Sequence, residues 1–307
     1  MNTKLAIAIP TYNRKNILYE TIDYILEEVI ENAIYIYIVD DSTNDDTYNT
    51  ISEKYYNISN IIYIKNDVNI GHDKNFFNTI SLVKEQYVWY LGDSMLIKKG
   101  TITNLLKIIE SSEYDFIVLN EDSRRFILKD NLFIDYLSVL DNIGWHLTMS
   151  GVTIYNLNTL KYFQKCDSNL YKNFPQLALV VHYIYNNEFK LLWISDKCIF
   201  GNKNKISYWA NNVFEVFIND LESTLKNTNL PYELVLKVIK DHSDYTQIFS
   251  INKLIKYRSI GIFNFKIFLK YKHKIGQYSN TNLLLAFIVS ILNKSSLRFF
   301  LKFTPKL

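Results

Sequence analysis

Four short segments of the chain carry polar and acidic residues in patterns that could bind a charged ligand. They are Pro10-Thr11-Tyr12-Asn13-Arg14, Asp40-Asp41, Asn69-Ile70-Gly71 with Lys74 and Asn75, and Gly92-Asp93. Carboxylates accept hydrogen bonds or hold a divalent cation, and an arginine offsets negative charge. A glycine lets the backbone turn or approach a ligand closely. These residue types would form one site only if the fold brings the four segments together.

The elements between these segments alternate between strand and helix. Short apolar runs predict strands at Leu5–Ile9, Ile34–Val39, Asn60–Ile64, Tyr87–Leu91 and Asp115–Leu119. Helical spacing predicts helices at Asn16–Ile30, Asp45–Tyr56, His72–Lys84 and Gly100–Ser111. This alternation indicates an α/β fold with a mostly parallel sheet covered on both faces, in which ligands bind beyond the carboxyl ends of the strands. Three of the polar segments directly follow predicted strands, so they should share that edge.

The rest of the chain is less regular and then becomes helical. The pattern predicts strands at Ser150–Tyr155 and Leu191–Ile194 and a helix at Phe174–Asn186. We therefore expect one domain over residues 1–212, with halves at about 1–120 and 121–212, followed by a helical region over 213–307.

Composition excludes several classes of protein. Of the 307 residues, 48% are hydrophobic and 21% charged, so the chain can bury a core and is not a disordered polymer. Cys166 and Cys198 are far apart, which argues against a disulfide scaffold or a structural zinc site. The apolar run Leu283–Leu292 is shorter than the roughly 20 residues that a membrane span needs. The start of the chain lacks the apolar length of a signal peptide, so we expect a cytoplasmic protein.

In this order and at these intervals, the segments AIAIPTYNR, IYIVDDSTNDDT, NDVNIGHDKNFFNT and YVWYLGDS resemble the family 2-like glycosyltransferases with the GT-A fold. The resemblance is good over about residues 1–120 and weak beyond. It implies a Rossmann-like, mostly parallel sheet flanked by helices. It also implies transfer of a sugar from a nucleoside diphosphate, most simply a UDP-sugar, to a glycan or lipid-linked saccharide in cell-surface polysaccharide or glycoconjugate assembly.

The same resemblance assigns the donor site. Pro10, Thr11 and Tyr12 would form a slot for the nucleoside, and Asp40 would accept hydrogen bonds from the base or the ribose. Either aspartate of the Asp40-Asp41 pair could instead cap the next helix. The remaining donor-site residues would be Asn13, Arg14, Asp41, Asn69, Gly71, Lys74, Asn75 and Gly92.

Asp93 is the expected metal ligand and catalytic residue, but the chain departs from the family here. The family places further aspartates where this chain has Ser94 and Met95. Asp93 could bind Mg²⁺ or Mn²⁺ through one carboxylate, the donor phosphates and waters. Alternatively, metal binding is weak or lost and an Arg or Lys stabilises the leaving group, or the chain is an inactive homologue.

No catalytic base can be carried over from the family. The helix that would supply it opens with Phe174-Pro175-Gln176, which has no carboxylate. Glu121, Asp122 and His146 are substitutes, and we predict His146 because the pKa of a histidine suits proton transfer. A retaining reaction without such a base stays open.

Charge is divided unevenly along the chain. The formal net charge of +3 combines −8 over residues 1–250 with eleven basic and no acidic residues over 251–307. Basic residues interleaved with Phe and Leu suit an anionic bilayer, so we expect a peripheral protein at the inner face of the cell membrane and no nucleic acid. A helical appendage with solvated charges is the plainer interpretation.

Three further alternatives concern function and assembly. A non-catalytic, membrane-attached glycosyltransferase-like binding protein would explain the missing carboxylates. A sugar nucleotidyltransferase would need a glycine-rich loop after the first strand, and the segment IPTYNR has no glycine. A homo-oligomer stays open.

Overall fold

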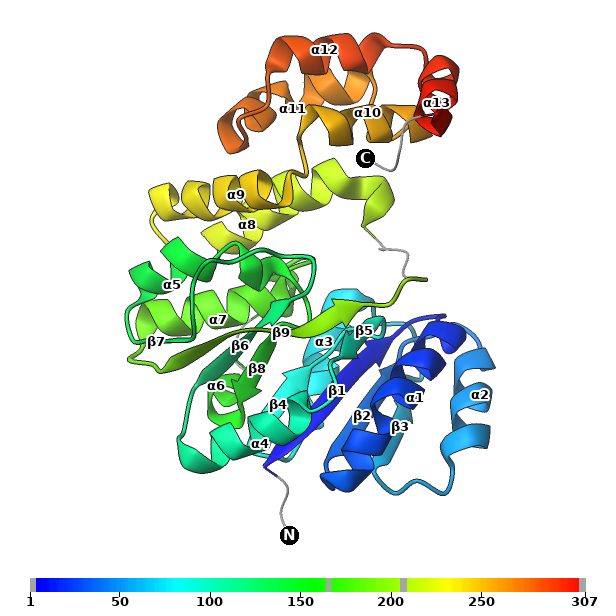
Figure 1. The fold of residues 1–307 in the computed structure, drawn as a ribbon, viewed down its shortest axis with the longest axis vertical. Helices are drawn as coiled ribbons and strands as arrows, with labels where there is room; N and C mark the ends of the chain where they lie inside the picture. The colour runs from blue at the N-terminus through cyan, green and yellow to red at the C-terminus, as the bar shows by residue number, and fades with distance from the viewer. Residues whose placement is uncertain (1–3, 164–166, 205–208, 304–307) are drawn as a thin grey trace. The chain divides into compact units, whose positions relative to one another are not determined.

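The computed structural model describes residues 4–163, 167–204 and 209–303, which fall into two compact units. Unit 1 is Met1–Ile206 and unit 2 is Ser207–Leu307 (Figure 1). Cys198 is a buried free thiol, whereas Cys166 lies outside the described residues.

Unit 1 is built on one mixed sheet of nine strands. Their bounds are β1 (Leu5–Thr11), β2 (Tyr35–Asp40), β3 (Ile61–Lys65), β4 (Tyr87–Tyr90), β5 (Met95–Ile97), β6 (Phe116–Glu121), β7 (Asn131–Phe133), β8 (Thr153–Asn156) and β9 (Leu191–Gly201). The order is β3-β2-β1-β4-β8-β6-β9-β5, and β7 also pairs with β9. Strands β1 to β4 pair in parallel, as do β6 and β9, whereas β8 is antiparallel to both β4 and β6.

Helices cover the sheet on both faces. Their bounds are α1 (Lys15–Glu31), α2 (Asp46–Tyr55), α3 (His72–Ser81), α4 (Thr101–Ser111), α5 (Tyr136–Ile143), α6 (Leu157–Phe163) and α7 (Pro175–Asn186). The chain reverses its winding direction after β3, because β4 lies beyond β1 rather than beyond β3. Right-handed crossovers therefore place α1 and α2 on one face and α3 on the other, as Figure 1 shows.

The predicted α/β class is confirmed, and the sheet shows where its ligand edge lies. Since β8 is antiparallel to both of its neighbours, β4 and β6 run in the same direction. The carboxyl ends of β1, β2, β3, β4 and β6 consequently share one edge, and the polar segments follow four of these strands. The short strands β5 and β7 and the helices α5 and α6 were not predicted, because their few residues carry too little periodicity.

Unit 2 is helical, as expected. Its elements are a π-helical turn (Glu215–Asp220), α8 (Leu221–Lys226), α9 (Tyr232–Thr246), α10 (Ile251–Ile260), α11 (Phe265–Tyr278), α12 (Leu283–Ile291) and α13 (Lys294–Phe303). The side chains of Ser250, Asn264 and Asn282 cap α10, α11 and α12 by accepting from backbone N–H groups of the first turn. Phe214 stacks on Phe249 and Phe263 in the core of this unit. Over the described residues, no helix is long and apolar enough to cross a membrane.

Candidate active site

The ends of β1 and β4 join three of the predicted residues in one cluster. Arg14 Nη1 lies 3.0 Å from Asp93 Oδ1, and Thr11 Oγ1 donates to Asp93 Oδ2 at 3.2 Å. Asp93 is buried, so its charge needs these partners. Thr21 of α1 donates to the carbonyl oxygen of Asp93 at 2.8 Å and fixes the backbone there. The sheet register brings this cluster together because β1 and β4 are hydrogen-bonded neighbours.

The oxygen atoms around Asp93 do not form a binding site for a metal ion. Both oxygens of Asp93 already accept hydrogen bonds, one of them from a cation. Ser94 and Met95 follow and add no carboxylate, and residues 4–163, 167–204 and 209–303 contain no group of three or more His, Cys, Asp or Glu that could hold a metal. Mg²⁺ and Mn²⁺ prefer anionic oxygen ligands, which an arginine at 3.0 Å from Asp93 disfavours.

Asp40, at the end of β2, is fully buried and held on both oxygens. Ser42 donates to Oδ1 through its backbone N–H at 2.9 Å and through its hydroxyl. Tyr63 of β3 donates to Oδ2 at 2.5 Å, and burial together with this bond raises the pKa of Tyr63. Ser42 Oγ also accepts from the backbone N–H of Asn13 at 2.7 Å. Asp40 therefore fixes the loop that lies beside the start of α1.

Asp41 organises the loop between β3 and α3. Its carboxylate accepts from the Asn66 and Asn69 amides at 2.8 Å each, and from the backbone N–H groups of Ile70 and Gly71 at 2.8 and 2.9 Å. Gly71 has φ +85°, a conformation that other residues rarely adopt, so the glycine is needed for this turn. Asn75 closes the cluster by accepting from Asn66 at 3.0 Å.

Neither aspartate caps the next helix, so the capping interpretation is wrong. The N-cap position of α2 belongs to Asp45, which makes no capping hydrogen bond through its side chain. Asp40 and Asp41 bind neighbouring loops instead, which explains why the sequence carries an adjacent pair.

The other predicted donor-site residues occupy different surroundings. Tyr12 is half exposed and can stack on a flat ring, while Pro10 is partly buried next to it. Lys74 lies exposed on α3. Gly92 forms the turn after β4, where its carbonyl accepts from the N–H of Met95 at 2.9 Å.

His146 is fully buried and both of its ring nitrogens are engaged. Arg124 can only donate, so its contact at 3.1 Å makes Nδ1 the acceptor, and Nε2–H donates to the Leu119 carbonyl at 2.9 Å. Burial, together with the nearby Arg124 charge, holds the pKa of His146 well below its ordinary value. Its lone pair is already used, so this geometry gives His146 no means of accepting a substrate proton.

We expect His146 to stay neutral in the folded protein down to acidic pH. In the unfolded chain His146 binds a proton near pH 6.5, whereas in the folded chain it stays neutral. The contribution of His146 to stability is therefore complete above this pH and is lost as the pH falls below it. Between pH 7.5 and 5.5 the loss from this group should be about 1 kcal/mol. Urea unfolding at both pH values, compared with His146→Gln, measures it. An equal pH dependence in the two proteins would contradict the assignment.

Glu121 and Asp122, the other candidate bases, end β6 at the ligand edge. Glu121 is buried, and Ser123 donates to its Oε2 through both its backbone N–H at 3.0 Å and its hydroxyl at 2.5 Å. Asp122 is exposed and lies 3.4 Å from Lys197 Nζ. Gln176, in the first turn of α7, donates to the Thr148 carbonyl at 3.0 Å. Thr21 and Arg124 were missed by the sequence analysis, because their partners are distant in the chain.

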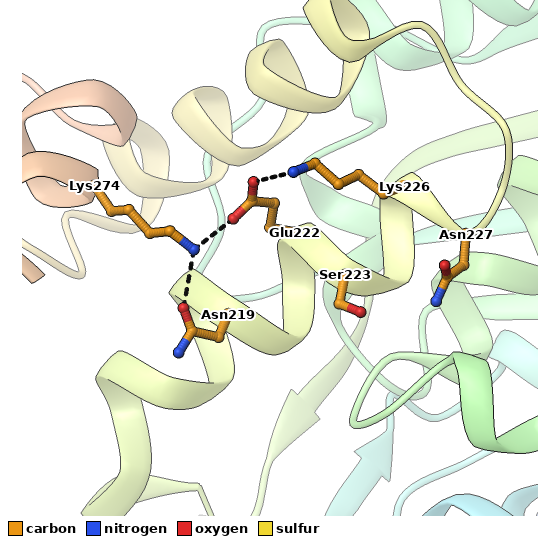
Figure 2. Close-up of a pocket in the computed structure, with 6 residues that line it drawn as sticks. All are labelled: Asn219, Glu222, Ser223, Lys226, Asn227 and Lys274. Atoms are coloured by element: carbon orange, nitrogen blue, oxygen red, sulfur yellow. Dashed lines mark hydrogen bonds and ion pairs between the residues drawn. The ribbon is translucent and has the colours of Figure 1, made fainter.

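A separate hollow of about 390 Å³ lies within unit 2. Figure 2 shows its lining residues Asn219, Glu222, Ser223, Lys226, Asn227 and Lys274. Glu222 accepts from Lys226 at 2.6 Å and from Lys274 at 2.7 Å. Burial works against ionisation, but the two lysine hydrogen bonds outweigh it and lower the pKa of Glu222 to about 2. The charges of this hollow are paired internally, which indicates a structural role.

The sequence model of glycosyl transferase family 2 matches residues 6–130, the part that carries the Thr11–Arg14–Asp93 cluster. Residues 6–130 of the chain are thus similar to the family 2 glycosyltransferases. Abequosyltransferase RfbV of Salmonella typhimurium is 34% identical to this chain over 110 residues, which are 35% of the chain and 33% of that protein. The chain thus spans about a third of the length of this relative.

Solved structures indicate that the chain has the GT-A fold. Residues 1–349 of S. aureus TarS in complex with UDP-GlcNAc superpose with a TM-score of 0.59 at 16% identity, covering 97% of this chain and 92% of that one. Mannosyltransferase PcManGT from Pyrobaculum calidifontis, in complex with GDP-Man and Mn²⁺, gives 0.58 at 12% identity over 79% and 70% of the two chains. At these identities the likeness shows the fold.

Proposed function

We propose that the protein transfers a sugar from a nucleoside-diphosphate donor to a hydroxyl of a glycan or lipid-linked saccharide during cell-surface polysaccharide assembly. The observation that supports this most directly is the ion pair between the partly buried Arg14 and the buried Asp93 where β1 and β4 end, within the matched family segment. A relative named as a sugar transferase and structural neighbours solved with UDP-GlcNAc and GDP-Man support a nucleotide-sugar donor. A UDP-sugar is the first to test.

The donor would lie along the ligand edge. Tyr12 would stack on the base, with Pro10 and Thr11 completing the slot, and the loops fixed by Asp40 and Asp41 would contact the ribose. Arg14 would offset the charge that grows on the diphosphate as the sugar–phosphate bond breaks. Asp93 would hold the guanidinium in place, at 3.0 Å. Arg14 would thus supply the positive charge that a Mg²⁺ or Mn²⁺ ion would supply in a metal-dependent reaction.

Glu121 replaces His146 as our proposed base for the acceptor hydroxyl. It ends β6 at the same edge as Asp93, and the two hydrogen bonds from Ser123 to Oε2 hold its carboxylate in one orientation. An Asp122 carboxylate beside Lys197 is exposed and less firmly oriented. General-base catalysis is worth roughly 100- to 10,000-fold, so Glu121→Gln should lower transfer by at least the smaller factor.

The test is turnover of a panel of UDP-, GDP- and dTDP-sugars by the purified chain, with released nucleoside diphosphate as the readout. Glu121→Gln should reduce transfer to an added acceptor more than it reduces donor binding, measured by thermal shift. Binding without turnover of any donor, with or without membrane extract as acceptor, would contradict the proposal and favour the non-catalytic alternative.

We also propose that the enzyme works at the inner face of the cell membrane, where lipid-linked acceptors are found. The eleven basic and no acidic residues of 251–307 support attachment to an anionic surface.

A further inference from the structure

Helix α12 is packed with its small side chains inward and its large apolar side chains outward. Ala286, Val289 and Ser290 are 0%, 5% and 1% exposed. The exposed fractions of the others are 37% for Leu283, 68% for Leu284, 45% for Leu285, 38% for Phe287, 42% for Ile288 and 55% for Ile291. A helix on the surface of a water-soluble domain normally shows the reverse arrangement.

The apolar surface continues onto α11. Phe265 and Leu269 of that helix are 45% and 47% exposed. The Phe265 ring contacts the Phe287 ring edge-on, with centroids 6.1 Å apart. We call this surface, with the exposed residues of α12, the α12 face. Contiguous apolar surface of this kind marks a docking site rather than scattered exposed residues.

Lysines border the α12 face, and one carboxylate, that of Asp244, reaches the turn before α12, where it accepts from Asn280 at 2.8 Å. Lys266 is exposed next to Phe265, and Lys294 begins α13 just after α12. Acidic residues are absent beyond Asp244. The ion pairs of α11 in the described residues, Lys270–Glu215 and Lys274–Glu222, use acids from the start of unit 2. The surface is therefore apolar at its centre and mainly cationic at its border.

We infer that the α12 face inserts into the headgroup region of an anionic lipid bilayer. The leucines, isoleucines and Phe287 would enter the acyl boundary, while the bordering lysines meet the lipid phosphates. At nine residues, α12 is too short to cross a bilayer, so it would lie in the interface. The inference specifies the surface for the proposed membrane attachment and rests on that part of the proposed function alone, independently of sugar transfer.

The test is co-sedimentation of the full chain with vesicles of phosphatidylcholine alone or with 30% phosphatidylglycerol. Wild type should bind the anionic vesicles, and the triple variant Leu284→Ser, Ile288→Ser, Ile291→Ser should bind at least tenfold more weakly. The matched control replaces Ile30, Ile134 and Leu137, three exposed apolar residues of unit 1, with Ser and should bind like wild type. Donor turnover without vesicles, measured in parallel, should be equal in all three proteins.

Three results would overturn the inference. The first is equal vesicle binding by the triple variant and wild type, and the second is no binding of anionic vesicles by wild type. The third is a dimer in light scattering that the triple variant dissociates while vesicle binding is absent, which would assign the α12 face to a second copy of the chain. If wild type turned over no nucleotide-sugar donor, that result would instead count against the transferase proposal.

Discussion

Replacing Asp93 with alanine is expected to lower donor turnover by about 100-fold, the usual cost of losing one transition-state electrostatic contact. Asp93 holds Arg14 at 3.0 Å, so its removal frees the guanidinium and leaves the developing diphosphate charge without a fixed partner. Arg14→Ala should lower donor turnover by about the same factor. Because the two residues act as one unit, the double variant should be little worse than either single variant, which is a non-additivity that kcat/KM values measure directly.

Chelation distinguishes this arginine-based mechanism from a metal-based one. Wild type treated with EDTA should keep its turnover, because both carboxylate oxygens of Asp93 accept hydrogen bonds from Thr11 and Arg14 and do not form a cation site of their own. Asp67→Ala removes an exposed aspartate and is the matched control, with unchanged activity expected. Full loss of turnover with EDTA and recovery with Mn²⁺ would contradict the role given to Arg14, as would additive effects of the two substitutions.

Asp41→Ala should be the most destabilising single change at the site, at about 3 kcal/mol of unfolding free energy. Its carboxylate accepts four hydrogen bonds from the loop between β3 and α3, including two from backbone N–H groups that would lose their partner. Urea unfolding followed by the fluorescence of Trp89, Trp145 and Trp193, all in unit 1, measures the change.

Asp67→Ala serves again as the control for this loop, because Asp67 is an exposed aspartate of the same segment and should change stability by less than about 0.5 kcal/mol. Similar small effects of the two substitutions would show that Asp41 does not hold the loop together. If Asp41→Ala weakened donor binding without lowering stability, Asp41 would be a donor-binding residue, as the sequence predicts.

The sequence predicted what depends on local patterns. Strands at Leu5–Ile9 and Tyr87–Leu91 are visible as apolar runs, and the rule for parallel sheets then places the residues after them at one edge. It could not show that Arg14 reaches Asp93, because 79 residues separate them and the pairing arises from strand order. Nor could it show that both ring nitrogens of His146 are engaged. Its surroundings come from Leu119 and Arg124, which no local spacing reveals.

Short elements were missed because their partners lie far along the chain. Strand β5 has only three residues, and it is a strand because Met95 and Ile97 pair with Gly201 and Ile199 of β9. The capping interpretation of Asp40 and Asp41 used the same kind of local rule and was wrong, since their partners include Tyr63 and Gly71. Local rules find elements, whereas side-chain partners depend on the assembled sheet.

The turn that carries Asp93 is held at three successive carbonyls. Met95 N–H donates to Gly92 O at 2.9 Å, Thr21 Oγ1 to Asp93 O at 2.8 Å and Asn202 N–H to Ser94 O at 2.8 Å. The amide protons of Met95 and Asn202, which donate to this turn, should therefore exchange with solvent only when the sheet itself opens. The ordering entropy of this turn is lost once, when the chain folds, so donor binding need not order it again.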